Sequence, residues 1–302
     1  MYDIAIIGAG PAGLTAALYA LRADKSVIVL EKGAFGGQIT FSPKVENYPG
    51  YKEMSGNEFA DKLMDQVMSL GGEIELDEVT EVVPGDSFTV KCSSGAEFES
   101  KTVIIAAGSK HRQLGLENEN KLVGNGISYC AVCDGAFYKG KKVAVIGGGN
   151  TALQEAVMLS DICESVTIVQ NLPTLTGEKK LAEILEAKNN VSMIFNSVVT
   201  ALEGDSELTG IKIKGTNGDE QTLAFDGIFV AIGQAPENKP FENLCDLNDY
   251  GYINADESCL LSTPGVFVAG DCRTKSVRQI ATAVGDGAVA AVNACKYIDA
   301  KN

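Results

Sequence analysis

Residues 3–13 read DIAIIGAGPAG, and this stretch decides the fold. An almost unbroken apolar run, residues 2–7, ends in the glycine-rich turn, and residues 14–21 continue with a helical composition. A second apolar run, residues 27–30, ends in Glu31, 18 residues beyond Gly13. In a dinucleotide-binding unit such glycines let the backbone approach a pyrophosphate at a helix N-terminus, and the acid binds ribose hydroxyls. The alternative interpretation is a glycine turn that holds no ligand.

The same unit occurs twice in the chain. Residues 3–32 align without a gap on residues 142–171, so that Gly8 falls on Gly147 and Gly13 falls on Ala152. Each copy ends in a further apolar strand, residues 103–108 and 228–233. A third strand of this kind, residues 266–271, follows the second copy and must belong to the first domain. We therefore expect an α/β protein with two Rossmann-like, three-layer (ββα) dinucleotide-binding domains, the second inserted into the first.

The expected domains are residues 1–114 with 243–302, and residues 115–242, with chain crossings near 114–117 and 235–243. The last segment, residues 280–298, repeats apolar residues on one helical face and predicts a packed helix. Its start, Arg278-Gln279-Ile280, would place a positive helix end beside the cofactor crevice.

Composition limits the possible partners and locations. The chain has 302 residues, of which 45% are hydrophobic, and a net charge of -15, which argues against nucleic acid or an anionic membrane as partner. No apolar run reaches membrane-spanning length, and the first twenty residues have Asp3 instead of a basic start and contain three glycines. We expect a cytoplasmic protein.

Two of the eight cysteines, Cys130 and Cys133, are close in sequence and are followed by Asp134. A zinc site would need a second ligand pair, and the chain has one histidine, His111. The pair therefore predicts a redox disulfide and no metal site, with an adjacent carboxylate that can move protons. The six scattered cysteines are expected to be buried thiols.

The chain resembles the low-molecular-weight flavoprotein thioredoxin reductases from end to end. The resemblance is carried by GAGPAG (8–13), GGQ (36–38), VENYPG (45–50), CAVCDG (130–135), GGGNTA (147–152), Gly270-Asp271 and Arg278-Gln279. It implies a homodimer, FAD in the first domain, a redox disulfide in the second, and thioredoxin as the substrate. The residues it implies for FAD binding are Gly8, Gly10, Pro11, Ala12, Gly13, Glu31, Lys32, Gly37, Gln38, Asn47, Val82, Gly108, Gly270, Asp271, Arg278, Gln279 and Ile280.

The same resemblance implies that Cys133 lies nearer the flavin, that Cys130 attacks the protein substrate, and that Asp134 is the acid/base. Larger disulfide reductases use a histidine near the carboxyl end for proton transfer, and His111 is near neither that end nor the cysteines in sequence. Asp134 is then the one titratable neighbour. The alternative is that Asp134 is only a turn or capping residue before Gly135.

The second copy departs from the NADPH-dependent members of the family. In the self-alignment Glu31 corresponds to Gln170, and residues 170–176 read QNLPTLT, where those members carry a His-Arg-Arg cluster. An NADH site favours an acid at this position, and an NADPH site favours arginines just after it. The chain has four arginines, and none lies within residues 115–242; Lys179 and Lys180 predict a solvated helix face. We therefore expect the second domain to have lost the nicotinamide cofactor.

This pattern resembles the ferredoxin-dependent flavin thioredoxin reductases, so the expected electron donor is reduced ferredoxin. Ferredoxins are acidic, and docking to this acidic chain would need a basic patch. Three groups qualify, and the one after Asp271 is expected nearest the flavin: Lys110 with Arg112; Lys139 with Lys141 and Lys142; Arg273 with Lys275 and Arg278. Two alternatives stay open: an NAD(P)H-dependent disulfide reductase with an unfamiliar nucleotide site that uses Lys179 or backbone groups, and a flavin-based redox sensor without reductase turnover.

Overall fold

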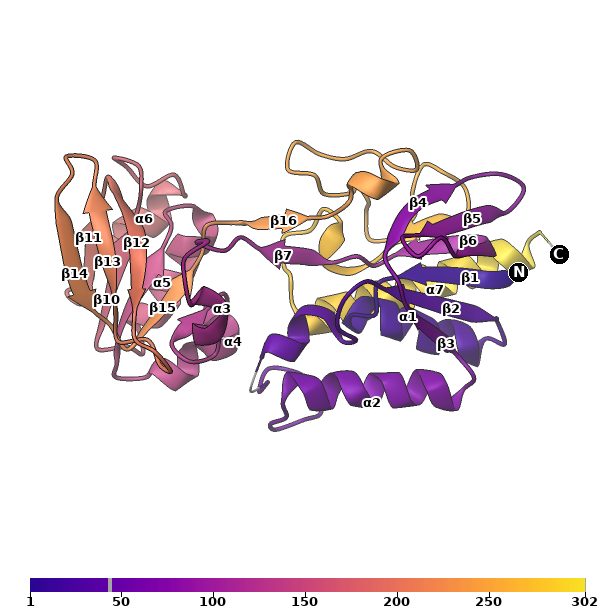
Figure 1. Cartoon of the computed structure of the whole chain (residues 1–302), viewed down its shortest axis with the longest axis horizontal. Coiled ribbons are helices and arrows are strands. Elements are labelled where there is room, and N and C mark those ends of the chain that lie inside the picture. The colour runs from indigo at the N-terminus through magenta and orange to yellow at the C-terminus, as the bar shows by residue number, and fades with distance from the viewer. Residues whose placement is uncertain (43–44, 302) are drawn as a thin grey trace. The chain divides into compact units, whose positions relative to one another are not determined.

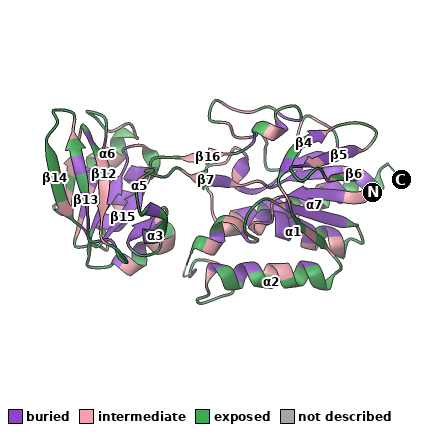
Figure 2. Cartoon of the chain, viewed as in Figure 1, coloured by how far each residue is buried: buried purple, intermediate pink, exposed green. Residues whose placement is uncertain are grey.

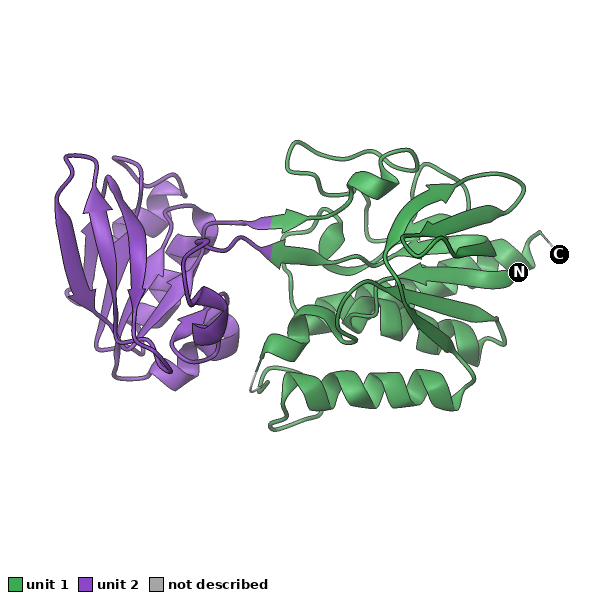
Figure 3. Ribbon diagram, viewed as in Figure 1, with its two compact units in different colours: residues 1–110, 235–302 green, residues 111–234 purple. Residues whose placement is uncertain are grey.

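The computed structural model describes residues 1–42 and 45–301, and the chain divides into two compact units (Figure 3). Unit 1 consists of Met1–Lys110 and Ala235–Asn302, and unit 2 of His111–Gln234. The divisions fall four and eight residues before the expected ones, because the two crossing segments pair with each other as strands β7 (Ser109–His111) and β16 (Gln234–Pro236). Arg112 therefore belongs to unit 2, so this unit contains one arginine.

The glycine-rich unit forms the centre of the sheet in unit 1 (Figure 1). The strands β1 (Tyr2–Ile7), β2 (Val27–Glu31), β3 (Glu73–Leu76) and β6 (Glu97–Ile105) lie in the order β3-β2-β1-β6, all parallel. The third predicted strand, β17 (Val266–Val268), pairs with β6, so the chain returns to the first sheet as expected. Buried parallel strands read as continuous apolar runs, which is why β1, β2, the end of β6 and β17 were visible in the sequence. The edge strand β3 is mostly exposed and was not predicted.

Two cores cover the two faces of this sheet. On one face α1 (Pro11–Arg22) and α7 (Ile280–Asp299) pack on Ile4, Ile6 and Ile104. On the other face the antiparallel strands β4 (Val79–Val83) and β5 (Phe88–Cys92) pack on Ala5 and Ile105. The helix α2 (Gly56–Ser69) begins at a Ser55/Glu58 capping box. The remaining short helices of unit 1 are η1 (Gly37–Phe41), η3 (Lys239–Phe241) and η4 (Gly270–Cys272).

Unit 2 repeats the plan. Its parallel sheet has the order β11-β10-β9-β15-β8, and an antiparallel sheet has the order β12-β13-β14. The strands are β8 (Ile127–Ser128), β9 (Lys142–Ile146), β10 (Ser165–Val169), β11 (Val191–Ile194), β12 (Ser197–Glu203), β13 (Gly210–Gly215), β14 (Glu220–Ala224) and β15 (Gly227–Val230). The helices are α3 (Glu119–Leu122), α4 (Ala131–Asp134), η2 (Gly135–Tyr138), α5 (Asn150–Ser160) and α6 (Lys179–Glu186). The predicted α/β fold with two Rossmann-like domains is confirmed.

Burial follows the same pattern in both units, with apolar strands inside and charged helix faces outside (Figure 2). All six cysteines outside the close pair are buried thiols, as expected. Within the described ranges, the helices are all too short or too polar to span a bilayer.

Candidate redox and dinucleotide sites

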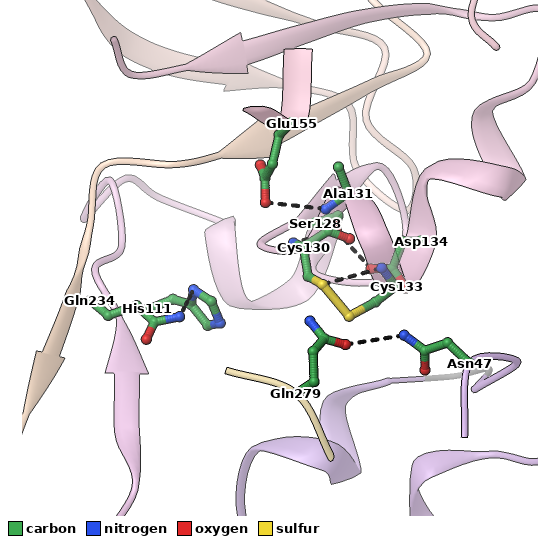
Figure 4. The surroundings of a disulfide bond; sticks show 10 residues. All are labelled: Asn47, His111, Ser128, Cys130, Ala131, Cys133, Asp134, Glu155, Gln234 and Gln279. Carbon is green, nitrogen blue, oxygen red and sulfur yellow. Dashed lines mark hydrogen bonds between the residues drawn. A yellow bond between two sulfur atoms is a disulfide. The ribbon is translucent and has the colours of Figure 1, made fainter. Parts of the chain in front are cut away.

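The close cysteine pair forms a disulfide at the start of α4 (Figure 4). β8 ends at Ser128, and the helix begins directly after Cys130, so that Cys133 lies one turn further along. The two Cα atoms are 5.3 Å apart, and the backbone N–H of Cys133 donates to Sγ of Cys130 at 3.2 Å. Val132, between them, has 55% of its surface exposed. The pair is thus held in a helical turn whose outer side is exposed.

Asp134 lies at the end of the same turn, and its side chain points to the strand before the disulfide. Ser128 Oγ donates to Asp134 Oδ2 at 2.6 Å, while Oδ1 is buried and has no hydrogen-bond partner among the described residues. Burial raises the pKa of the Asp134 carboxyl, and the hydrogen bond from Ser128 partly opposes this. The side chain does not cap the following helix η2. Asp134 therefore holds its proton to a higher pH than an ordinary aspartate does.

His111 is engaged elsewhere in unit 2. Its ring stacks on Tyr129, with centroids 5.3 Å apart, and Nδ1 lies 3.5 Å from Gln234 Nε2. Burial lowers the pKa of the His111 imidazole, which favours the neutral ring. These contacts fit a structural role at the crossing between the units better than proton transfer to the disulfide.

The glycine-rich turn of unit 1 brings backbone unusually close to backbone. Gly8 has φ +107, and a Cβ at Gly13 would lie 1.8 Å from the Gly8 carbonyl oxygen. Helix α1 begins at Pro11 with Gly10 as N-cap and has no capping side chain. Its first N–H groups and positive helix end therefore face the turn, where they suit a phosphate.

A cavity of about 380 Å³ opens beside this turn, entirely within unit 1. Gly8, Glu31 and Lys32 line it, together with Glu237 and Phe241 from the segment after β16. Glu31 Oε2 accepts from the Ala9 N–H at 2.7 Å, which places this carboxylate at the end of β2 above the turn. The volume and the mixed lining suit the nucleoside half of a dinucleotide.

A second group of predicted residues meets at the start of η4 and α7. Asp271 Oδ1 is buried without a partner in the described part of the chain, and burial raises the pKa of this carboxyl to about 6. Arg278 Nε donates to the Asp271 carbonyl at 3.2 Å, and Asn47 Nδ2 donates to Gln279 Oε1 at 3.1 Å. A buried, unpaired carboxyl oxygen is what a hydroxyl-bearing ligand would satisfy.

The structure links the remaining residues that were predicted to bind the cofactor less directly to this cavity and to Asp271. Val82 is fully buried, and its carbonyl accepts from Asn243 Nδ2 at 2.9 Å; the β4 residue that lines the cavity is Val79. Gly37 lies against Gly10, and Gly270 against Ala12. Gln38 is exposed, Gly108 is half-buried with φ +69, and Ile280 packs beside Phe59.

In the equivalent turn of unit 2, the side chain of Gln170 forms hydrogen bonds within its own loop. Gln170 has 4% of its surface exposed; its Nε2 donates to the Thr174 carbonyl at 3.3 Å, and its Oε1 accepts from the Asn171 N–H at 3.2 Å. A Cβ at Gly148 would lie 2.5 Å from Gln170 Nε2. The position that holds Glu31 at a cavity in unit 1 is thus filled in unit 2 by an amide bonded to its own loop.

An acid also lies at the start of the unit 2 helix. The Glu178 N–H donates to Asn150 Oδ1 at 2.6 Å, and Asn150 Nδ2 donates to Glu178 Oε1 at 3.5 Å. Asn150 is the first residue of α5, where a pyrophosphate would bind in a dinucleotide domain. Lys179 is exposed and pairs with Glu183 on its own helix, as a solvated face does.

The basic group expected nearest the flavin is wrong as a docking surface. Arg273 has 2% of its surface exposed and forms two hydrogen bonds of 2.9 Å to Asp286, while Lys275 donates to Asp286 at 2.8 Å. Arg278 lies 4.1 Å from the ring centroid of Tyr252. These cations stabilise unit 1 internally. In contrast, Lys139, Lys141 and Lys142 are exposed.

Known proteins are similar to this chain over its whole length. Residues 2–287 match the family described as pyridine nucleotide-disulphide oxidoreductase. A thioredoxin reductase of Listeria monocytogenes is 42% identical over 99% of this chain and 94% of its own. A 34.2 kDa protein in a rubredoxin operon of Clostridium pasteurianum is 40% identical over 99% of this chain and 98% of its own. The crystal structure of thioredoxin reductase from Streptococcus pyogenes has a TM-score of 0.93 and 39% identity over 99% of both chains.

Proposed function

We propose a function from one premise: the chain belongs to the thioredoxin reductases within the pyridine nucleotide-disulphide oxidoreductase family. We infer that it is a flavoprotein thioredoxin-disulfide reductase with the Cys130/Cys133 disulfide as its redox centre. FAD in unit 1, when bound, supplies the electron pair that opens this disulfide. Thioredoxin is the proposed substrate, and a cytoplasmic homodimer is the proposed form.

The residues of unit 1 fit FAD in two places. The first N–H groups of α1 would hold the pyrophosphate, and Glu31 would accept from the ribose hydroxyls. Asp271, whose buried oxygen has no partner in the described ranges, would accept from a hydroxyl of the ribityl chain. Lys32 forms an ion pair with Glu237 at the rim of the cavity. Together these residues bind and orient the cofactor.

In unit 2 we assign the attack on thioredoxin to Cys130 and resolution of the mixed disulfide to Cys133. The thiolate of Cys130 would attack one substrate sulfur and displace the other as a thiolate. Asp134 would protonate that leaving sulfur, because its raised pKa keeps a proton available. The Cys133 thiolate would then attack Cys130, reform the disulfide and release the reduced substrate.

We further propose that the electrons come from reduced ferredoxin. The observation that carries this is the state of Gln170, which is buried and bonded to its own loop where a nicotinamide nucleotide needs a ribose-binding acid or nearby arginines. Without a bidentate phosphate contact, NADPH affinity should fall by at least about a hundredfold. A ferredoxin near about -400 mV would drive reduction of a thioredoxin near about -270 mV by roughly 6 kcal/mol.

A second candidate donor is NAD(P)H. It is favoured by the family as a whole, whose description names the pyridine nucleotide, and by helix α5, which lacks a capping side chain at its N-terminus. Lys179 would have to leave Glu183 and reach the nucleotide in this case. A flavin-based redox sensor is distinguished from both by an absence of electron flow to thioredoxin.

The donor is tested by adding NADPH, NADH or reduced ferredoxin to the oxidised flavoprotein under anaerobic conditions. We expect ferredoxin at micromolar concentration to bleach the flavin absorbance within seconds and to support thioredoxin reduction. Neither nucleotide should do so at the same concentration, because the unit 2 turn offers no group for the phosphate. Bleaching by micromolar NADPH or NADH would overturn the ferredoxin proposal while leaving the disulfide reductase intact.

Asp134→Asn tests the proton donor. We expect thiol-disulfide exchange with thioredoxin to slow by at least about tenfold, because an amide cannot protonate the leaving sulfur. FAD content, measured by absorbance after denaturation, should not change, since Asp134 lies in unit 2. Asp161→Asn is a matched control, because this aspartate is exposed on the same unit. An unchanged exchange rate in Asp134→Asn would contradict this role and leave Asp134 only as a hydrogen-bond partner of Ser128.

A further inference from the structure

Unit 2 contains a second buried carboxyl group next to the disulfide turn. Glu155 lies in the middle of α5, among residues that form the core of this unit, and has 8% of its surface exposed. Its Oε1 accepts from the backbone N–H of Ala131, the first residue of α4, at 3.2 Å. Figure 4 shows the side chain reaching from α5 to this N–H, next to the disulfide. Glu155 therefore contacts the redox turn directly after Cys130.

One of the two oxygens of the Glu155 carboxyl group forms no hydrogen bond with the described residues. Glu155 Oε2 is buried and has no hydrogen-bond partner in the part of the chain that the structure describes. No Lys or Arg of the described residues pairs with it: on the neighbouring helix α6, Lys179 and Lys180 are exposed. Burying a glutamate in an apolar core without a cation costs free energy and favours its protonated form, which suggests that this residue has a functional role.

The titratable group of α4 whose charge acts on Glu155 is another acid, Asp134. Burial raises the pKa of Glu155 to about 7, the Ala131 N–H partly opposes this, and the charge of Asp134 adds to it. Burial and, to a smaller extent, the charge of Asp134 raise the pKa of the Tyr138 phenol on η2 to about 12, so Tyr138 stays neutral. Two acids that repel each other in a low-dielectric region titrate as a pair.

Both acids have the same kind of unsatisfied atom. Asp134 Oδ1 and Glu155 Oε2 are each buried without a partner among the described residues. Glu155 accepts from the N–H of the first residue of α4, and Asp134 is the last residue of that helix. A negative charge on one therefore makes the other hold its proton more tightly, and this effect is reciprocal.

On the basis of the proposed reductase function, we propose that Glu155 is a positioning residue that stores, together with Asp134, the proton exchanged with the Cys130/Cys133 dithiol. When the Cys130 thiol loses its proton, the carboxyl pair takes it. The Cys130 thiolate then attacks the substrate disulfide, a new S–S bond forms, and the substrate bond breaks. The pair returns the proton to the sulfur that leaves.

Electrons and protons are conserved over the full exchange. The dithiol loses two electrons and two protons and becomes the disulfide, and the substrate disulfide gains both and becomes a dithiol. The Cys133 proton follows the same route when Cys133 displaces the second substrate sulfur. The carboxyl pair ends in the state in which it began. Glu155 acts through Asp134, because its own contact is to the Ala131 N–H and not to sulfur.

A purely structural role for Glu155 would be to accept the N–H at the start of α4. Glu155→Gln separates the two roles, because glutamine keeps the acceptor oxygen and the shape but cannot take up a proton at neutral pH. Glu183→Gln is the matched control, since it removes an exposed carboxylate from α6 in the same unit. Both variants keep every group assigned to the flavin site.

The experiment uses the holoprotein with its cysteine pair reduced by dithiothreitol, and a small aromatic disulfide as the oxidant. This exchange needs neither ferredoxin nor thioredoxin, so it stands if either of those assignments fails. We expect the pH profile of the rate to show an inflection near pH 7 in the unaltered protein and in Glu183→Gln. In Glu155→Gln the inflection should move to lower pH, and the rate at pH 7 should fall by about tenfold.

Infrared difference spectra between the oxidised and reduced protein provide the second readout. We expect a protonated-carboxyl band that titrates near pH 7 and is lost in Glu155→Gln. If this variant folds and keeps both the inflection and the band, the proposal is overturned and Glu155 is a helix cap only. If the variant does not fold, the pH titration of the band in the unaltered protein decides instead, and absence of a band near neutral pH overturns the proposal.

Discussion

We expect Cys130→Ser to lower thioredoxin turnover by at least about a thousandfold while the flavin is still reduced by its donor. Serine keeps the shape of the side chain, but its hydroxyl is far less acidic than a thiol and cannot form a disulfide with the substrate. The residues proposed to bind FAD all lie in unit 1, so cofactor content should not change. Anaerobic flavin absorbance and an insulin-coupled thioredoxin assay measure the two halves separately.

The companion variant Cys133→Ser tests the order of attack. If Cys130 is the attacking thiol, Cys133→Ser should accumulate a stable mixed disulfide between Cys130 and thioredoxin, because the resolving thiol is missing. Mass spectrometry identifies the trapped cysteine. Cys163→Ala controls for the loss of a thiol from unit 2, since Cys163 is buried and unbonded, and it should keep turnover. Substantial turnover in Cys130→Ser, or a mixed disulfide trapped by that variant, would contradict the assignment.

Much of the fold is predictable because the sequence contains two copies of the dinucleotide-binding unit. The strand before Gly8 and the strand before Gly147 are buried on both faces, so each reads as an apolar run ending in a turn that only glycine can form. The third strand of this kind, β17, could be assigned to unit 1 only because the repeat was already known. The boundaries between the two units were predicted less accurately, because β7 and β16 are short, half-polar strands without a periodic pattern of apolar residues.

The sites were predictable where a local motif carries the chemistry, and not where distant residues meet. The Cys130/Cys133 disulfide is local, and the structure forms it. Glu155 lies 24 residues from Ala131, and a single glutamate on a helix looks like any solvated residue until its partner is known. Glu237 reaches the cavity from beyond the whole of unit 2, and no spacing rule connects it to Glu31.

Arg273 shows why charge alone misleads. In the sequence it stands with Lys275 and Arg278 as a basic cluster after Asp271, which is the pattern of a docking patch. In the structure Arg273 and Lys275 both bind one aspartate, Asp286, on α7. Arg278 instead donates to the Asp271 carbonyl and lies over the Tyr252 ring. Sequence patterns report how many charges are present, whereas docking depends on which of them reach solvent.

That buried cluster is the basis of the largest stability effect we expect. Asp286→Asn should lower the free energy of unfolding by about 3 kcal/mol, because Arg273 and Lys275 would remain buried without their counterion. Chemical denaturation followed by circular dichroism measures this. Glu257→Gln is the matched control: it also approaches Arg273, at 3.6 Å, but is 97% exposed and should change stability little. Equal stability of the two variants would contradict the assigned role of Asp286.

We expect the same aspartate to couple stability to pH and to the proposed FAD site. Burial would raise the pKa of Asp286, but the hydrogen bonds from Arg273 and Lys275 outweigh this effect and lower it. The ionised Asp286 therefore stabilises the folded protein above the ordinary aspartate pKa, and this stabilisation is lost as the pH falls through the lowered pKa. Asp286→Asn should therefore flatten the acid limb of the stability profile. Asp286 Oδ2 also accepts from the Gly270 N–H at 3.0 Å, one residue before Asp271. We expect the variant to release FAD at a lower denaturant concentration than Glu257→Gln does, because the turn that positions the Asp271 carboxyl loses its charged anchor.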